Sequence, residues 1–98
     1  MRYTAYDYKT LEVLGQSHSI QNARIKGYNY VNKNKNRKVS ITMVRKADTV
    51  YGRSVAETNV GEIEYCTKYN IVLWLPYDKG IQKGVYKLGK DGSAKRLK

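Results

Sequence analysis

One amphipathic helix, predicted between Ser19 and Val31, constrains the fold of this chain more than any other segment. At helical spacing, one stripe collects the residues that should face the interior: Ile20, Ala23, Gly27, Tyr30 and Val31. The two smallest, Ala23 and Gly27, lie at the centre of the stripe, so the helix backbone should approach a sheet closely. The remaining apolar segments are strand-like, and the sequence therefore predicts a single helix.

Both ends of this helix carry residues that suit helix termini. Ser17 or Ser19 can cap the first turn, because a serine hydroxyl accepts a hydrogen bond from a free backbone N–H. Asn32 or Asn34 can adopt the left-handed conformation that commonly closes a helix. We expect a basic polar connector to follow, which ends at Lys38.

Strand patterns account for most of the remaining chain. Apolar residues alternate over residues 39–44, which predicts a strand with one apolar face and one face that carries Lys38, Ser40 and Thr42. Ile71–Leu75 is apolar on both faces, as in the central strand of a covered sheet. Further strands are predicted at Tyr3–Tyr6, Leu11–Leu14, Glu62–Cys66 and Gly84–Leu88.

Polar residues, glycine and proline mark the predicted turns. Asp7–Thr10 should join the first two strands, and Gly15 should end the second. Pro76, the only proline, should end the strand that begins at Ile71.

Two later segments are less regular. Lys46–Gly61 has no clean period and is predicted to be a long loop with a strand fragment around Thr49–Tyr51. Asp91-Gly92 is a two-residue hairpin-turn signal. It would fold Ser93–Leu97 back as an edge strand, or residues 89–98 would form a frayed basic end.

This order of elements predicts one α+β domain over residues 1–98, with one helix packed on a mainly antiparallel sheet in the order β-β-α-β-β-β-β. Leu, Ile and Val total 21 residues and Phe is absent, so ten tyrosines and Trp74 must supply much of the core. A tyrosine hydroxyl needs water or a partner when its ring is buried. We therefore expect a thin core with wet edges.

Positive charge is concentrated in two blocks. The net charge is +11, and no Asp or Glu occurs between Val13 and Ala47. Residues 13–47 carry +8 and residues 79–98 carry +6, whereas residues 48–78 carry −3. Such asymmetry favours a polyanionic partner, with nucleic acid as the first choice.

The first function hypothesis is a small non-enzymatic nucleic-acid-binding protein that recognises mainly the phosphate backbone. Lysine and arginine would meet phosphates, and the Ser40/Thr42 face would add hydrogen bonds to phosphates or base edges. The predicted contact residues are Lys33, Lys35, Arg37, Lys38, Ser40, Thr42, Arg45, Lys46, Lys95 and Arg96. The sequence leaves open whether the target is DNA or RNA, and whether it is single- or double-stranded.

Tyrosines are candidate stacking platforms for unpaired bases, although a place in the core is the commoner role for each. The candidates are Tyr28, Tyr30, Tyr51, Tyr65, Tyr69, Tyr77 and Tyr86.

The second hypothesis is a phage or mobile-element accessory protein that binds and modulates a host protein or ribonucleoprotein complex. Ile25 and Tyr28 lie off the apolar stripe beside Arg24, so they form either a second contact surface within the fold or a partner site. The basic block would then meet acidic side chains or bound RNA. An anionic membrane is the third and least favoured target, because no large apolar helix face adjoins the basic stretch.

No catalytic or cofactor-binding signature accompanies these features. His18 lies between two serines without the strained turn of a nucleophile, and Glu62 and Glu64, interpreted as solvent-facing charges, lack a third ligand for a metal. Cys66 is alone, so no internal disulfide or zinc cluster is predicted. We expect no enzymatic activity, no cofactor and no metal, and a cytoplasmic protein without a signal peptide or membrane span.

Overall fold

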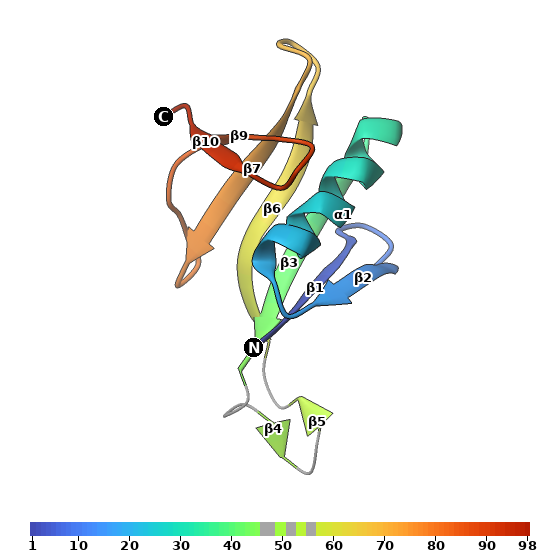
Figure 1. Cartoon of the computed structure of the whole chain (residues 1–98), viewed down its shortest axis with the longest axis vertical. Coiled ribbons are helices and arrows are strands. Elements are labelled where there is room, and N and C mark those ends of the chain that lie inside the picture. Colours follow the sequence, from blue (N-terminus) through green and yellow to red (C-terminus); the bar gives the residue numbers. More distant parts are fainter. Residues whose placement is uncertain (46–48, 51–52, 55–56) are drawn as a thin grey trace.

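A computed structural model describes residues 1–45, 49–50, 53–54 and 57–98 of the chain. Figure 1 shows one helix beside a long, twisted antiparallel sheet. The elements in chain order are β1 (Arg2–Asp7), β2 (Val13–Ser17), α1 (Ile20–Lys33), β3 (Lys38–Val44), β4 (Thr49–Val50), β5 (Arg53–Ser54), β6 (Thr58–Cys66), β7 (Ile71–Asp78), β8 (Ile81–Gln82), β9 (Tyr86–Leu88) and β10 (Ala94–Arg96).

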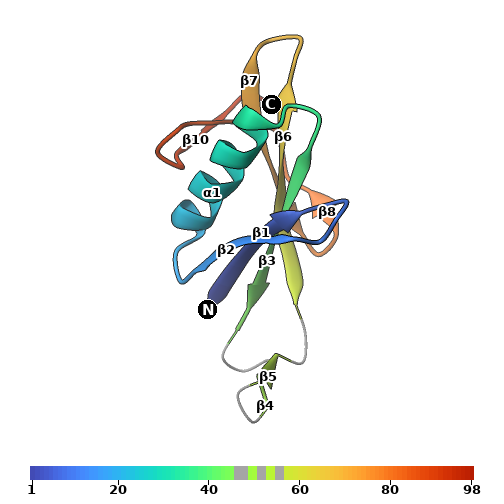
Figure 2. The ribbon, with the colours of Figure 1, turned by 90° about the vertical axis from the view of Figure 1, so that its right-hand side faces the viewer.

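The main sheet has the strand order β10-β9-β7-β6-β3-β1-β2, and β8 pairs with β7 beside this path. All described pairs are antiparallel. In Figure 2, α1 and the turn before β10 lie on one side of the sheet and β8 lies on the other. The short β4–β5 hairpin projects beyond one end of β3 and β6 (Figure 1). The predicted α+β class, with one helix on an antiparallel sheet, is confirmed.

The helix packs on the sheet through the predicted stripe. Ala23, Gly27 and Val31 are its buried residues. A Cβ at Gly27 would collide with the Cδ1 of Ile63 on β6 and lie 3.2 Å from a methyl group of Val39 on β3. The helix backbone therefore approaches these two strands more closely than a side chain at position 27 would allow.

The ends of α1 match one prediction and correct another. Ser19 is the N-cap, and its side chain accepts a hydrogen bond from the backbone N–H of Asn22 at 3.3 Å. Asn34 is the C-cap, but its φ of −124° is not left-handed, so the predicted closing conformation is wrong. Instead, both its backbone N–H and its side-chain amide donate to the carbonyl of Tyr30, at 2.9 Å each. These bonds end the helix without a left-handed residue.

Trp74 supplies the largest ring of the core. It is buried on β7, and its indole covers Gly61 on β6, where a Cβ would collide with the ring. The guanidinium of Arg24, from α1, lies 5.4 Å from the ring centroid on the helix side of the sheet. This cation–π contact and the bare glycine hold the indole between the helix and the sheet.

Tyrosines line the margin of this core, as the composition predicts. Aliphatic and small residues from β1, α1, β3, β6, β7 and β9 form its centre. Five half-buried tyrosines pack against that centre: Tyr3, Tyr28, Tyr30, Tyr65 and Tyr86. Their hydroxyls reach the protein surface or a polar partner, which meets the requirement of a phenol at the edge of an apolar region.

Several strand limits differ from the predictions. Gly15 lies inside β2 rather than after it, where it pairs with Ala5 and leaves room for the stem of Lys26 from α1. Pro76 lies inside β7, beyond the Val72–Trp74 segment that pairs with β9, where a missing N–H breaks no ladder. β6 occupies the middle of the strand order, so β7 is an interior strand but not the central one. β6 also begins at Thr58 and takes four residues from the predicted loop.

The predicted loop before β6 contains the β4–β5 pair. Thr49 and Val50 of the predicted strand fragment form β4, whereas Tyr51 lies outside the described residues.

The C-terminal residues form an edge strand, which decides between the two alternatives for this segment. β10 pairs with β9, and the turn between them spans three residues, 90–92, with Gly92 at φ +83°. The turn is longer than the predicted two residues, because Gly89 and Ser93 form the last pair of the ladder, with an N–H to carbonyl distance of 2.8 Å. It packs on α1, where Gln21 and Arg24 donate to its carbonyls at 2.8 and 2.9 Å.

The tight helix–sheet contact predicts the effect of enlarging residue 27. Gly27→Leu should lower the free energy of unfolding by about 1–3 kcal/mol, because the side chain must displace Ile63 and Val39. Asn29→Leu, at an exposed position of the same helix, is the control and should be neutral or slightly stabilising. Urea denaturation of both variants measures the difference. A Gly27→Leu protein as stable as the wild type would contradict this packing.

Candidate nucleic-acid interface

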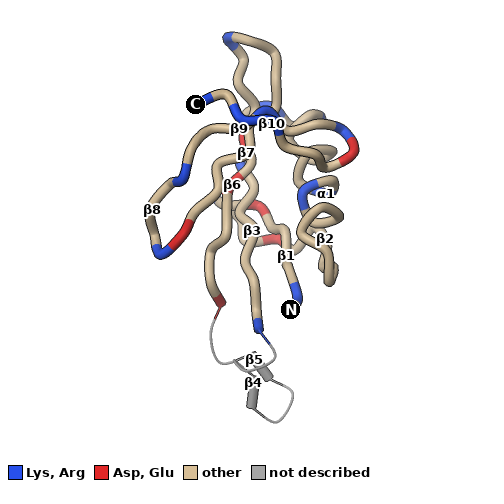
Figure 3. Tube along the Cα trace, turned by 60° about the vertical axis from the view of Figure 1, so that its left-hand side comes forward, with Lys and Arg blue, Asp and Glu red and all other residues tan. Residues whose placement is uncertain are grey.

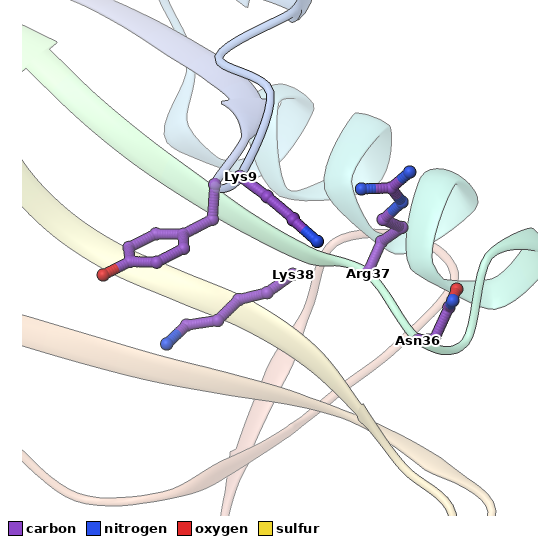
Figure 4. A pocket seen from close by; sticks show the side chains of 5 residues that line it. Lys9, Asn36, Arg37 and Lys38 are labelled. Carbon is purple, nitrogen blue, oxygen red and sulfur yellow. The ribbon is translucent and has the colours of Figure 1, made fainter.

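A basic hollow of about 230 Å³ lies where the turn after β1 meets the connector between α1 and β3. Its lining residues are Tyr8, Lys9, Asn36, Arg37 and Lys38, and we call this set the basic hollow. Figure 4 shows Lys9 from the turn and Arg37 from the connector extending toward the same region of the view, whereas the Lys38 side chain extends the other way. Three cations, one amide and one aromatic ring thus share a single concave surface.

The buried carboxylate of Asp7 holds the two sides of the hollow together. One oxygen accepts hydrogen bonds from the backbone N–H groups of Lys9 and Thr10, at 2.8 and 2.9 Å. The other oxygen accepts from the hydroxyl of Tyr30 on α1, at 2.6 Å, and lies 3.9 Å from Nε of Arg37. A single side chain therefore fixes the turn, the helix and the start of β3.

These contacts stabilise the charged form of the carboxyl group. The hydrogen bond from Tyr30 is the largest cause, and the amides of Thr10 and Lys9 and the charge of Arg37 add to it against the opposing effect of burial. Together they lower the pKa of Asp7 from 3.8 to about 2. The same bond raises the pKa of the Tyr30 phenol. At neutral pH Asp7 is an anion whose oxygens are already occupied, so it does not face a ligand in the hollow.

The three cations of the hollow differ in how much of their charge the protein itself uses. Lys38 is ion-paired with the buried Glu62 at 3.1 Å and lies 4.5 Å from the centroid of the Tyr8 ring. Burial lowers the pKa of Lys38, but the hydrogen bond and charge of Glu62 outweigh it, so the net shift is upward. Arg37 contacts Asp7 through Nε, which leaves its terminal nitrogens to meet an outside anion. The ammonium group of Lys9 has no partner among the described residues and is the freest charge.

Two of the predicted contact residues are buried and do not reach the surface. Ser40 and Thr42 are each 5% exposed, which overturns the expectation that they form an open polar face. They lie between β1 and β6, where Ser40 pairs with Tyr6 and Glu62 and Thr42 pairs with Thr4 and Asn59. Within the described part of the chain, the Thr42 hydroxyl is the one buried side-chain group without a hydrogen-bond partner.

Lys33 and Lys35 lie beside the basic hollow, on the end of α1 and on the connector. Lys33 lines a second, shallower hollow of about 300 Å³ with Lys26 and Asn34. Lys35 folds back on the structure, because its ammonium group donates to the carbonyl of Asn32 at 2.7 Å and lies 4.8 Å from the Tyr65 ring centroid.

The remaining predicted contact residues lie elsewhere. Arg45 follows the far end of β3, seven residues or roughly 20 Å from Lys38 along the strand. Lys95 and Arg96 are exposed on the edge strand β10, where Arg96 donates to the Tyr86 hydroxyl at 3.2 Å. Lys46 lies outside the described residues. Figure 3 shows the basic residues spread over β10, α1 and the β8 end rather than gathered on one face.

The structure uses the candidate partner-binding residues within the fold. Tyr28 is half-buried and packs against the core, and Ile25 is half-buried beside Gly92 of the last turn. Arg24 bonds to the carbonyl of Gly92 and stacks on Trp74, and burial lowers its pKa. Of the two alternatives for this pair, the structure shows a contact surface within the fold, because Ile25 lies against Gly92 of the β9–β10 turn and Tyr28 packs on the core. Whether they also bind a partner stays a prediction.

Three lining residues, Tyr8, Lys9 and Asn36, were not among the predicted contacts. Tyr8 and Lys9 lie in a charge-balanced segment, so block charge did not single them out. A more local signal was present, because an Asp at the start of a polar turn commonly accepts hydrogen bonds from the backbone N–H groups that follow it. Asp7 does so with Lys9 and Thr10, and the turn that results lies at the surface. Of the seven predicted stacking tyrosines, Tyr69 is exposed, five are half-buried, and Tyr51 lies outside the described residues.

Glu62 is not the solvent-facing charge that its alternation predicts. It is 6% exposed on an interior strand, where Lys38 neutralises it and the Tyr77 phenol lies beside it.

Among residues 1–45 and 57–98, no three His, Cys, Asp or Glu side chains come together as a metal site. None of the described helices has the length and apolar character needed to cross a membrane.

Comparison of the chain with models of known families, with curated proteins and with solved structures finds no match. A function for this protein therefore has to be inferred from its own geometry and charge.

The lowered pKa of Asp7 predicts how stability depends on pH. Because its folded-state pKa of about 2 lies below 3.8, its contribution is complete above about pH 4 and is lost as the pH falls toward 2. Asp7→Asn should melt at a lower temperature than the wild type at pH 7, and the difference should shrink between pH 4 and pH 2. Thermal melts followed by circular dichroism measure this. Asp78→Asn, which removes an exposed carboxylate at the end of β7, is the control. It should melt close to the wild type over the same pH range. A constant difference between Asp7→Asn and the wild type would contradict the role of the charge.

Proposed function

We propose that this protein binds nucleic acid, without enzymatic activity, through phosphate contacts centred on the basic hollow. One observation carries the proposal. Lys9 and Arg37, from segments 28 residues apart in the chain, are brought to one concave surface by a common buried carboxylate. A protein that needed these cations only for solubility would not require them to converge.

The chemistry of the lining suits a phosphodiester. Arginine offers a fork of N–H donors that matches two phosphate oxygens, and lysine offers a mobile point charge. The Asn36 side chain adds a neutral donor and acceptor at the same surface. Lys33 at the end of α1 and Lys35 on the connector extend the positive surface beyond the hollow.

The charge of the whole chain supports the same partner. A net charge of +11 on 98 residues attracts a polyanion over a distance set by the ionic strength. Most of the binding free energy would come from release of counterions by the phosphates that are neutralised. Affinity should therefore depend strongly on salt.

The second hypothesis, an accessory protein that modulates a host protein or ribonucleoprotein, stays a prediction. It relied on Ile25 and Tyr28, together with the long loop Lys46–Gly61, as the contact surface. The two side chains pack within the fold, and part of the loop lies outside the described residues. No observation on the described residues favours it over nucleic acid.

The most direct test removes the free cation. Lys9→Gln should weaken binding to nucleic acid, and the slope of log affinity against log salt should fall by about 0.7–0.9, the value for one lost phosphate contact. The fold should be unchanged, because the Lys9 ammonium group supports no described contact. Lys90→Gln, which removes one exposed charge from the β9–β10 turn, is the matched control and should change the slope by less. Fluorescence anisotropy titrations over a salt series provide the slopes.

Equal slopes for Lys9→Gln and the wild type would remove the basic hollow from the interface. The triple replacement of Lys35, Arg37 and Lys38, which the sequence alone suggests, is a poorer test. It would also leave Glu62 buried and unpaired, so lost binding and lost folding could not be separated.

A further inference from the structure

We infer that the basic hollow holds one unpaired nucleotide, with its base stacked on the ring of Tyr8 and its phosphate against Lys9 and Arg37. The ligand class is single-stranded nucleic acid. This inference rests on the proposed function and narrows it from any polyanionic strand to an unpaired one.

The exposure of Tyr8 is the first observation behind this inference. Its residue surface is 54% exposed, whereas the tyrosines at the core margin are half-buried. Its backbone N–H donates to the carbonyl of Lys38 at 2.8 Å, so the backbone that carries the side chain is fixed to the sheet. An exposed aromatic ring that is anchored at its backbone is a suitable platform for a base on the face that Lys38 does not cover.

The position of Lys38 strengthens the platform. Its ammonium group lies 4.5 Å from the centroid of the Tyr8 ring and is also held by Glu62 at 3.1 Å. The cation–π contact restrains the ring, and the ion pair restrains the lysine. A ring held in this way loses less conformational entropy when a base stacks on it.

The polar groups around the ring match the other parts of a nucleotide. Lys9 and the terminal nitrogens of Arg37 supply positive charge for a phosphate, and the Asn36 amide can pair with a base edge. Figure 4 shows Asn36, Arg37 and Lys9 around the same opening. Stacking, charge and an edge-reading group therefore occur within one hollow.

The size of the hollow favours a unit of a strand over a free nucleotide. At about 230 Å³ it is smaller than the roughly 300–1,000 Å³ of pockets that enclose a whole small molecule. A nucleotide within a strand needs only part of its surface covered by the hollow, because the adjacent nucleotides of the strand would lie outside it along the basic connector. In a duplex the base faces are already stacked on each other and cannot meet the Tyr8 ring.

The experiment compares a labelled short oligothymidylate with its duplex, by fluorescence anisotropy at fixed salt. The wild type should bind the single strand more tightly than the duplex. Tyr8→Leu should weaken single-strand binding about 5- to 150-fold, as expected for one lost stacking contact, and should weaken it more than it weakens duplex binding. Tyr8→Phe keeps the ring and should retain the single-strand affinity.

Tyr69→Leu is the matched control. Tyr69 is 65% exposed and has Lys68 at 5.3 Å from its ring centroid, but it lies on the β6–β7 turn and lines no described hollow. Its loss should leave single-strand affinity unchanged. Melting temperatures of all variants establish that each is folded.

Three results would overturn the inference. One is a wild type that binds duplex as tightly as the single strand. Another is an equal effect of Tyr8→Leu and Tyr69→Leu. The third is thymidine monophosphate competing as well as the oligomer, since the free nucleotide would then be the ligand. In the first two cases, salt-dependent binding that weakens in Lys9→Gln would leave the proposed function standing. Absence of binding to either strand form would overturn both.

Discussion

The contacts of the Asp7 carboxylate are the interaction on which the basic hollow depends. The carboxylate is fully buried, and it accepts hydrogen bonds from two backbone amides of the β1–β2 turn and from the phenol of Tyr30 on α1, while Arg37 lies beside it. A buried carboxylate is tolerated only when several donors satisfy it. Meeting this requirement forces the turn, the helix and the start of β3 together, and the basic hollow is the surface that results.

A second constraint positions the helix that contributes Tyr30. The close approach at Gly27 and the stacking of Arg24 on Trp74 leave α1 little freedom to rotate over the sheet. The β9–β10 turn closes over the same helix through its hydrogen bonds with Gln21 and Arg24. Contacts with the sheet and with the C-terminal turn thereby support one helix orientation, and that orientation brings Tyr30 to Asp7.

Positive charge in this protein serves two purposes that a count of residues does not separate. One group of cations interacts with other groups of the protein itself. Lys38 forms an ion pair, Lys35 forms a hydrogen bond and a cation–π contact, and Arg24 forms a hydrogen bond. Lys9 and Arg37 line the hollow instead, and Arg37 contacts Asp7 only through Nε. The net charge therefore predicts the class of partner through long-range attraction, whereas the few cations that line the hollow would decide where that partner is held.

The sequence by itself determined the α+β class, the helix with its buried Ala23–Gly27 stripe, a serine cap at Ser17 or Ser19 and the strands within β6 and β7, because these follow from local periodicity and capping chemistry. It also placed Arg37 and Lys38 on a basic connector. Only the tertiary structure decided that Ser40 and Thr42 are buried, that Ile25 and Tyr28 contact the fold itself, and that Tyr8 and Lys9 complete the hollow. Alternation tells which side chains share a face but not whether neighbouring strands cover that face. Nor does local pattern show that Asp7 reaches Tyr30, since that contact spans 23 residues and exists only once the helix has packed on the sheet.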